Sequence, residues 1–170
     1  LYIGGDMKIG VPKEVKVHEY RVGMTPESVA EAVRHGHELY IETQAGVGMG
    51  ATDDHYRQAG ATILDTADEL FQQATMIVKV KEPQPAERAR LKPEHILFTY
   101  LHLAPDGQQV EDLVASRATC IAYETITASN GGLPLLKPMS QVAGRMSVQA
   151  GAAALEKSHG GRGVLLGGVP

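Results

Sequence analysis

Three side chains that could bind and act on a small anion follow predicted strands of this sequence. Arg21 comes after the first predicted strand, Lys81 after the fourth and His102 after the fifth. A guanidinium offers a planar fork for a carboxylate, an ammonium can polarise a carbonyl oxygen, and histidine, which titrates near pH ~6.5, can carry a proton. Open α/β sheets bind ligands beyond the carboxyl ends of their strands, so we expect these side chains to share one pocket.

Each of these residues also has a simpler interpretation. An arginine in a loop or a lysine leaving a strand is commonly a solvated charge, and a lone histidine is usually structural. The other histidines fall near helix ends, turns or strand starts and are predicted to be surface or capping groups: His18, His35, His37, His55, His95 and His159. The predicted meeting of two cations and a base at one sheet edge favours the functional interpretation.

The elements that must position these residues alternate along the chain. From Met7, short β-rich runs alternate with helical patterns, which predicts an α/β fold with a parallel sheet of the flavodoxin-like or Rossmann-like kind. The predicted strands are 8–11, 38–42, 62–64, 76–80, 95–99 and 119–122. The predicted helices are one capped by Thr25 that ends at His35 and Gly36, one at 52–59, one opened by Asp65 over 66–73, and one opened by Asp106 that runs to about 116.

The pattern changes at Gly131–Pro134, after which a long helical stretch begins at Pro138 and ends near His159. Its inner positions are small, which suits a helix between domains or subunits, although an ordinary alanine-rich helix explains them equally well. We therefore expect an extension at 1–6, a substrate domain at 7–132, and an interdomain helix with the start of a truncated NAD-binding domain at 133–170.

Composition narrows the function classes. The chain has 170 residues, 43% of them hydrophobic and 21% charged, which is typical of a soluble globular domain. Its net charge of -4 comes from interspersed charges, so nucleic acid is not an expected partner. No apolar stretch is long enough to span a membrane and no secretory signal is visible. The single cysteine, Cys120, lies in a predicted buried strand and favours a reducing cytoplasm.

Most ligand motifs are missing from the sequence. No zinc spacing, phosphate loop or nucleophile elbow occurs, so no metal site is predicted. The segment Gly46–Ala51 formally matches the dinucleotide pattern G-x-G-x-x-G/A. The helix predicted after it is short, which favours a tight loop with positive φ angles over a cofactor site.

Several ordered segments together resemble the bacterial alanine dehydrogenases, a family related to the transhydrogenase alpha subunits. They are Met7–Glu14, Arg21–Pro26, Lys79–Pro83, Tyr100–Ala104 and Lys137–Met146. The resemblance implies an N-terminal domain completed by a returning C-terminal segment, with a Rossmann domain inserted between them. Because this chain ends before that Rossmann domain, we expect that it cannot turn over alone.

The resemblance implies specific roles in the substrate site. Arg21 would hold the carboxylate of L-alanine or pyruvate, and Lys81 would bind that carboxylate or polarise the carbonyl oxygen. Tyr100 would contact the substrate, and His102 would be the acid and base. The implied reaction is reversible oxidative deamination, in which hydride passes from the alanine Cα to NAD and water releases ammonia and pyruvate.

The resemblance also implies a cofactor site and an assembly. Met139 and Ser140, at the start of the long helix, would lie near NAD. The enzyme would be a homo-oligomer, a hexamer by resemblance, with no nucleic acid or membrane partner.

Two other functions remain open. One is the nucleotide-binding alpha subunit of a proton-translocating transhydrogenase, which shares the opening motif. That subunit has no amino acid to deaminate, so Lys81 and His102 together favour the dehydrogenase. The other is a non-catalytic ligand-binding or oligomerisation module, which need not prefer an α-keto acid.

Overall fold

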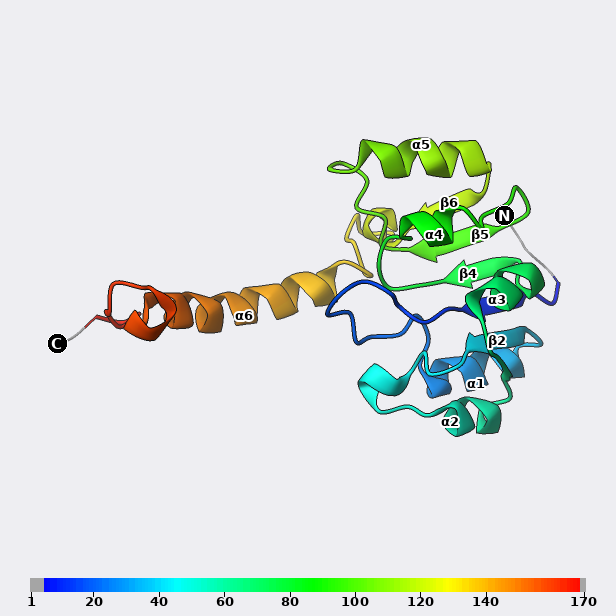
Figure 1. Cartoon of the computed structure of the whole chain (residues 1–170), viewed down its shortest axis with the longest axis horizontal. Coiled ribbons are helices and arrows are strands. Elements are labelled where there is room, and N and C mark those ends of the chain that lie inside the picture. The colour runs from blue at the N-terminus through cyan, green and yellow to red at the C-terminus, as the bar shows by residue number, and fades with distance from the viewer. Residues whose placement is uncertain (1–4, 169–170) are drawn as a thin grey trace. The chain divides into compact units, whose positions relative to one another are not determined.

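The computed structural model describes residues 5–168, and the predicted extension at 1–6 lies mostly outside them. The chain divides into two compact units, one ending at Tyr123 and one beginning at Glu124, and each is described by itself. The first unit holds a sheet of six parallel strands in the order β3-β2-β1-β4-β5-β6 (Figure 1). The predicted α/β class with a parallel sheet is confirmed.

The strands agree closely with the prediction. They are β1 (Lys8–Val11), β2 (Glu38–Glu42), β3 (Thr62–Leu64), β4 (Met76–Val78), β5 (Ile96–Thr99) and β6 (Thr119–Ala122). β4 ends two residues before the predicted end at Val80, but the chain stays alongside β5. The backbone N–H of Lys79 donates to Phe98 at 3.1 Å, and that of Tyr100 donates to Val80 at 3.3 Å.

The first unit has five α-helices. They are α1 (Pro26–Arg34), α2 (Asp53–Gln58), α3 (Ala67–Gln73), α4 (Pro85–Arg88) and α5 (Gly107–Ser116), with the 3-10 turn η1 (Val47–Met49). A second 3-10 turn, η2 (Tyr123–Thr125), begins at the last residue of this unit. Thr25 caps α1 as predicted, and Asp106 caps α5. The cap of α3 is Thr66 rather than the predicted Asp65, because the Thr66 hydroxyl accepts the Glu69 N–H at 3.2 Å. The short helix α4 was not predicted.

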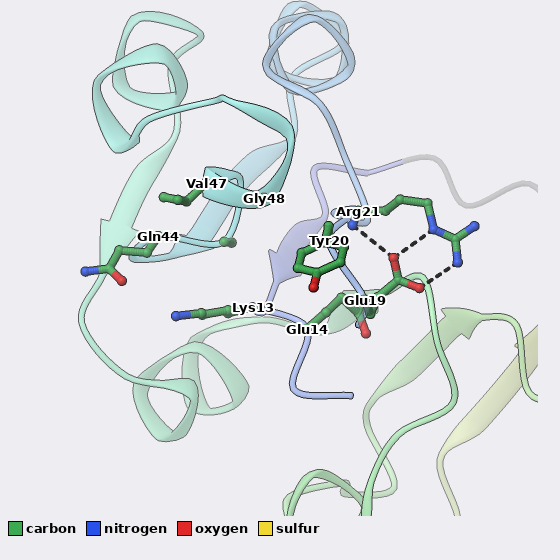
Figure 2. Close-up of a pocket in the computed structure, with 9 residues that line it drawn as sticks. Lys13, Glu14, Glu19, Tyr20, Arg21, Gln44, Val47 and Gly48 are labelled. Carbon is green, nitrogen blue, oxygen red and sulfur yellow. Dashed lines mark hydrogen bonds and ion pairs between the residues drawn. The ribbon is translucent and has the colours of Figure 1, made fainter. Parts of the chain in front are cut away.

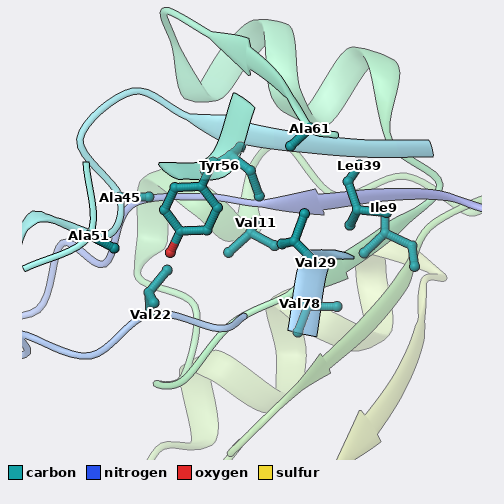
Figure 3. Packing of buried hydrophobic residues seen from close by; sticks show 11 residues of the cluster. Ile9, Val11, Val22, Val29, Leu39, Ala45, Ala51, Tyr56, Ala61 and Val78 are labelled. Carbon is teal, nitrogen blue, oxygen red and sulfur yellow. The ribbon is translucent and has the colours of Figure 1, made fainter. Parts of the chain in front are cut away.

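Helices cover both faces of the sheet. On one face, Val29 of α1 and Tyr56 of α2 pack against side chains of the central strands (Figure 3). On the other face, Leu70 of α3 and Leu113 of α5 pack against Ile77 and Leu97. Burying each such side chain contributes roughly 1.5–3 kcal/mol, so the two apolar clusters hold the strand ends in fixed positions.

The edge strand β6 corrects the prediction for Cys120. Its thiol is half-buried rather than buried, because β6 pairs only with β5 and leaves its outer side without a neighbouring strand. Burial still raises the pKa of the Cys120 thiol. A run of four small and apolar residues therefore indicated a strand correctly but not its place at the edge of the sheet.

The second unit is dominated by one helix, α6 (Lys137–Leu155), followed by the 3-10 turn η3 (Lys157–His159). The predicted helix was continuous to His159, but it ends at Leu155 because Glu156 has extended backbone angles, φ -71° and ψ 142°. Within residues 5–168, none of the helices has the length and apolar character needed to cross a membrane.

The loop after β1, residues 12–25, is pressed against β4. Val22 is buried in the apolar cluster of Figure 3, and the Tyr56 hydroxyl donates to the Met24 carbonyl at 3.0 Å. Between them, a Cβ built on Gly23 would lie 2.4 Å from the Val78 carbonyl oxygen. Only glycine lets this loop approach the end of β4 so closely.

This contact predicts the effect of Gly23→Ala. The added methyl group must push the loop away from a backbone atom, so the free energy of unfolding should fall by about 1–3 kcal/mol in urea denaturation. Gly107→Ala is the matched control, since a Cβ there meets nothing within 4 Å, and its effect should stay within about 0.5 kcal/mol. Equal stabilities for the two variants would contradict this account of the loop.

Candidate functional site

The strand order reverses between β1 and β4. β2 and β3 lie on one side of β1, and β4, β5 and β6 lie on the other. In open α/β sheets the crevice at such a reversal, beyond the carboxyl ends of the strands, is the common ligand site. Arg21 follows β1, Lys81 follows β4 and His102 follows β5, so the three candidates leave neighbouring strands at the same edge.

Arg21 is held by Glu19 in the loop after β1. The Glu19 carboxylate accepts hydrogen bonds from the Arg21 backbone N–H at 2.9 Å, from Nε at 2.8 Å and from Nη2 at 2.6 Å. These bonds lower the pKa of Glu19 and raise that of Arg21. The guanidinium, whose side chain is 48% exposed, is therefore charged and oriented.

Lys81 is half-buried at the exit of β4. Its backbone carbonyl accepts the Thr99 hydroxyl at 2.9 Å, which fixes this exit to β5. Its Nζ lies 3.9 Å from Glu82 Oε2. Its charge makes a small contribution to the lowered pKa of Glu19.

Tyr100 follows β5 and stands in the same neighbourhood. Its ring meets the ring of Tyr123 edge to face at 4.9 Å, and Tyr123 meets Phe98 in the same way at 4.4 Å. Tyr100 is also one of the groups that raise the pKa of Arg21. Burial raises the pKa of the Tyr123 hydroxyl, with smaller contributions from Tyr100 and Glu14.

His102 lies two residues further along, on an exposed turn. Its φ of 47° is in the left-handed region, which non-glycine residues adopt at a cost and which is often found at functional sites. The turn is anchored by its neighbour Leu101, which is 2% exposed and whose carbonyl accepts Gln109 Nε2 at 2.6 Å. The imidazole is thus presented from a fixed backbone.

Behind this edge lies a buried ion cluster that the sequence analysis did not predict. Lys79 is 1% exposed, and its Nζ lies 2.7 Å from a Glu87 oxygen and 3.2 Å from a Glu14 oxygen. The other Glu14 oxygen accepts the Val80 backbone N–H at 2.6 Å. Burial raises the pKa of Glu14 more than the Lys79 charge lowers it.

A cleft of about 310 Å³ opens beside Arg21, between the exits of β1 and β2 (Figure 2). Its lining residues are Lys13, Glu14, Glu19, Tyr20, Arg21, Gln44, Ala45, Val47 and Gly48. In the figure, Arg21 points toward Glu19, on the side of the cleft away from Lys13 and Gln44. Lys81, Tyr100 and His102 do not line this cleft.

The segment Gly46–Ala51 does not form a dinucleotide cradle. Its backbone N–H groups are used internally: Met49 and Ala51 both donate to the Gly46 carbonyl, at 3.1 and 3.0 Å. A Cβ on Gly48 would lie 2.4 Å from the Tyr20 carbonyl oxygen, and Gly50 has a φ of 85°. The glycines allow a tight loop, as the sequence favoured, and the helix after them, α2, has only six residues.

Two further points concern cofactors. Met139 and Ser140 lie near the start of α6 in the second unit. Within residues 5–168, no three histidine, cysteine, aspartate or glutamate side chains are grouped so that they could hold a metal ion.

The fold and these side chains define a class: a doubly wound α/β domain with cationic side chains at the strand-order reversal. A family model described as "Alanine dehydrogenase/PNT, N-terminal domain" matches residues 10–143. The chain belongs to this family, as the ordered segments in its sequence indicated.

Comparison with individual proteins agrees with this family assignment. The alanine dehydrogenases of Halomonas elongata and Mycobacterium tuberculosis are 56% and 49% identical to this chain over 164 residues, which are 96% of the chain and 44% of each relative. A solved L-alanine dehydrogenase is 54% identical with a TM-score of 0.85, covering 96% of this chain and 45% of that one. A transhydrogenase from Sinorhizobium meliloti is 25% identical with a TM-score of 0.64, covering 68% of this chain and 33% of that one. The chain spans less than half the length of these relatives.

The buried cluster predicts a large effect of Lys79→Met on stability. Removing the ammonium leaves two buried carboxylates facing each other, so the free energy of unfolding should fall by about 3–5 kcal/mol. Lys81→Met is the matched control two residues along the chain, where a half-exposed ion pair should contribute less than about 1 kcal/mol. A Lys79 variant as stable as the Lys81 variant would show that the cluster does not hold the domain together.

The raised pKa of Glu14 predicts a pH dependence. A carboxyl group whose folded pKa lies above its ordinary value of 4.5 stabilises the fold fully at pH values below 4.5, and this contribution is lost as the pH rises through the folded pKa. Glu14→Gln cannot titrate. The stability advantage of the wild type over this variant should therefore shrink in urea titrations as the pH rises from about 4.5 through the folded pKa of Glu14. An advantage that grows with pH would mean that the pKa is lowered instead.

Proposed function

We propose that this chain supplies the substrate-binding part of an NAD-dependent alanine dehydrogenase, which converts L-alanine reversibly into pyruvate and ammonia. The observation that carries the proposal is that Arg21, which Glu19 orients through three hydrogen bonds, and Lys81 leave β1 and β4 at the strand-order reversal. Two cations and a histidine that leave neighbouring strands suit a small carboxylate whose neighbouring carbon gives up a hydride and then takes up water with a proton transfer.

The proposed division of roles follows from the side chains. Arg21 binds the substrate carboxylate with its planar fork, and Lys81 binds the same carboxylate or polarises the carbonyl oxygen of pyruvate. Tyr100 borders the substrate. His102 takes a proton as water adds to the imine and returns it in the reverse direction.

The cofactor of the proposed enzyme is NAD, which accepts the hydride of the alanine Cα when bound. The only segment of residues 5–168 with a dinucleotide-like glycine pattern is closed by its own hydrogen bonds, so we assign NAD no cradle there. Met139 and Ser140 are carried over by resemblance as residues near NAD.

The related transhydrogenases share the fold at lower identity, 25% against 54% for the solved alanine dehydrogenase, and this favours the amino-acid reaction. We further propose a cytoplasmic homo-oligomer, a hexamer by resemblance. Exposed apolar residues on α6, among them Val142, Met146 and Val148, offer surface that such an assembly would bury.

The test is steady-state kinetics of the complete gene product with L-alanine and NAD. His102→Gln should lower kcat by about 10²–10⁴-fold, because the positioned proton carrier is lost. His18→Gln is its matched control, since His18 is also an exposed histidine with positive φ, 63°, and this variant should keep wild-type kcat. An enzyme that keeps full kcat with His102→Gln would refute the proposed role.

The two cations are tested in the same assay. Arg21→Met should raise the KM for alanine and pyruvate by at least about 10-fold, since a charge-assisted hydrogen-bonded contact is lost. Arg57→Met is a control arginine whose partner is Asp54, on the surface. If Arg21→Met leaves both KM values unchanged, the carboxylate is bound elsewhere and the proposed function loses its support.

A further inference from the structure

Glu19 is an unusual residue for a loop at a ligand edge. Its side chain is only 8% exposed, although the residues around it in the loop are largely solvent-facing. A carboxylate withdrawn from water in this way requires charged or hydrogen-bonded partners, and Arg21 supplies three hydrogen bonds to it. The position is therefore set by its interaction with Arg21 and not by solvation.

Glu19 engages Arg21 side-on. Its two carboxylate oxygens accept hydrogen bonds from Nε and Nη2 of the guanidinium, and one of them also accepts the backbone N–H of Arg21. Bonds from both the backbone and the side chain fix the direction of the planar guanidinium relative to the loop after β1.

We propose that Glu19 is a positioning residue, one that holds Arg21 in place for the carboxylate of the substrate. The inference rests on the proposed function. It predicts that loss of the Glu19 charge lets the guanidinium leave its fixed direction. Substrate binding then weakens, while the proton transfer at His102 is affected much less.

The experiment is Glu19→Gln in the complete gene product, with KM and kcat measured separately for pyruvate and for L-alanine. The KM values should rise by roughly 10- to 100-fold, as expected for a misplaced binding group, with kcat changed less than about 3-fold. Glu82→Gln is the matched control, because Glu82 lies 3.9 Å from Lys81 but does not hold Arg21, and its KM values should stay near those of the wild type. A lower KM for Glu19→Gln would overturn the inference, since it would make Glu19 a competitor of the substrate.

A double-mutant cycle separates positioning from a general loss of structure. In the Arg21→Met background, Glu19→Gln should have little further effect on KM, because Glu19 acts through Arg21. Additive effects would overturn the inference. If Arg21→Met itself leaves KM unchanged, the proposed function fails, whereas an effect of Arg21→Met without any effect of Glu19→Gln sinks only the inference. Should Glu19→Gln not fold, Glu19→Asp, which keeps the charge and shortens the reach, carries the same test with a smaller rise in KM.

Discussion

A lysine ammonium inside a protein must be surrounded by acceptors, and Lys79 is the group that imposes this requirement here. Its two carboxylate partners come from different parts of the chain: Glu14 from the loop after β1 and Glu87 from α4. The cluster can form only when that loop lies across the end of β4, where Glu14 also takes the Val80 N–H. One buried ion cluster thus joins the two sides of the strand-order reversal, which is where the ligand edge is built.

Opposite charges also lie next to each other on the exposed side of this edge. Just as Lys79 lies between two buried carboxylates, Glu19 lies near the two cations Arg21 and Lys81. The buried cluster fixes the backbone from which the exposed charges project, and Gly23 lets that backbone come close enough. The direction of the Arg21 side chain is thus set by Glu19, on a loop that the buried cluster and Gly23 hold against β4.

Much of the fold could be predicted from local sequence signals, but the ion pairs between distant residues could not. Strand bounds depend on short apolar runs and helix starts on caps such as Thr25, and these are readable over a few residues. The pairing of Lys79 with Glu14 spans 65 residues, so no local pattern contains it. A signal existed in the charged residue inside the run 76–80, since central parallel strands are buried on both faces. The prediction that His95 is a surface or capping group was wrong about the surface, because its second partner is also distant in the sequence. His95 accepts the Lys92 N–H, but it is only 2% exposed and its other ring nitrogen pairs with the Phe71 carbonyl.

The glycine-rich segment 46–51 shows why a sequence motif and a site are different things. Anion sites at Rossmann turns need backbone N–H groups that point outward from a helix N-terminus. Here those N–H groups close the turn η1, and Gly48 makes room for the Tyr20 backbone in the neighbouring loop. At this edge the positive charges come instead from side chains on two separate loops, Arg21 after β1 and Lys81 after β4.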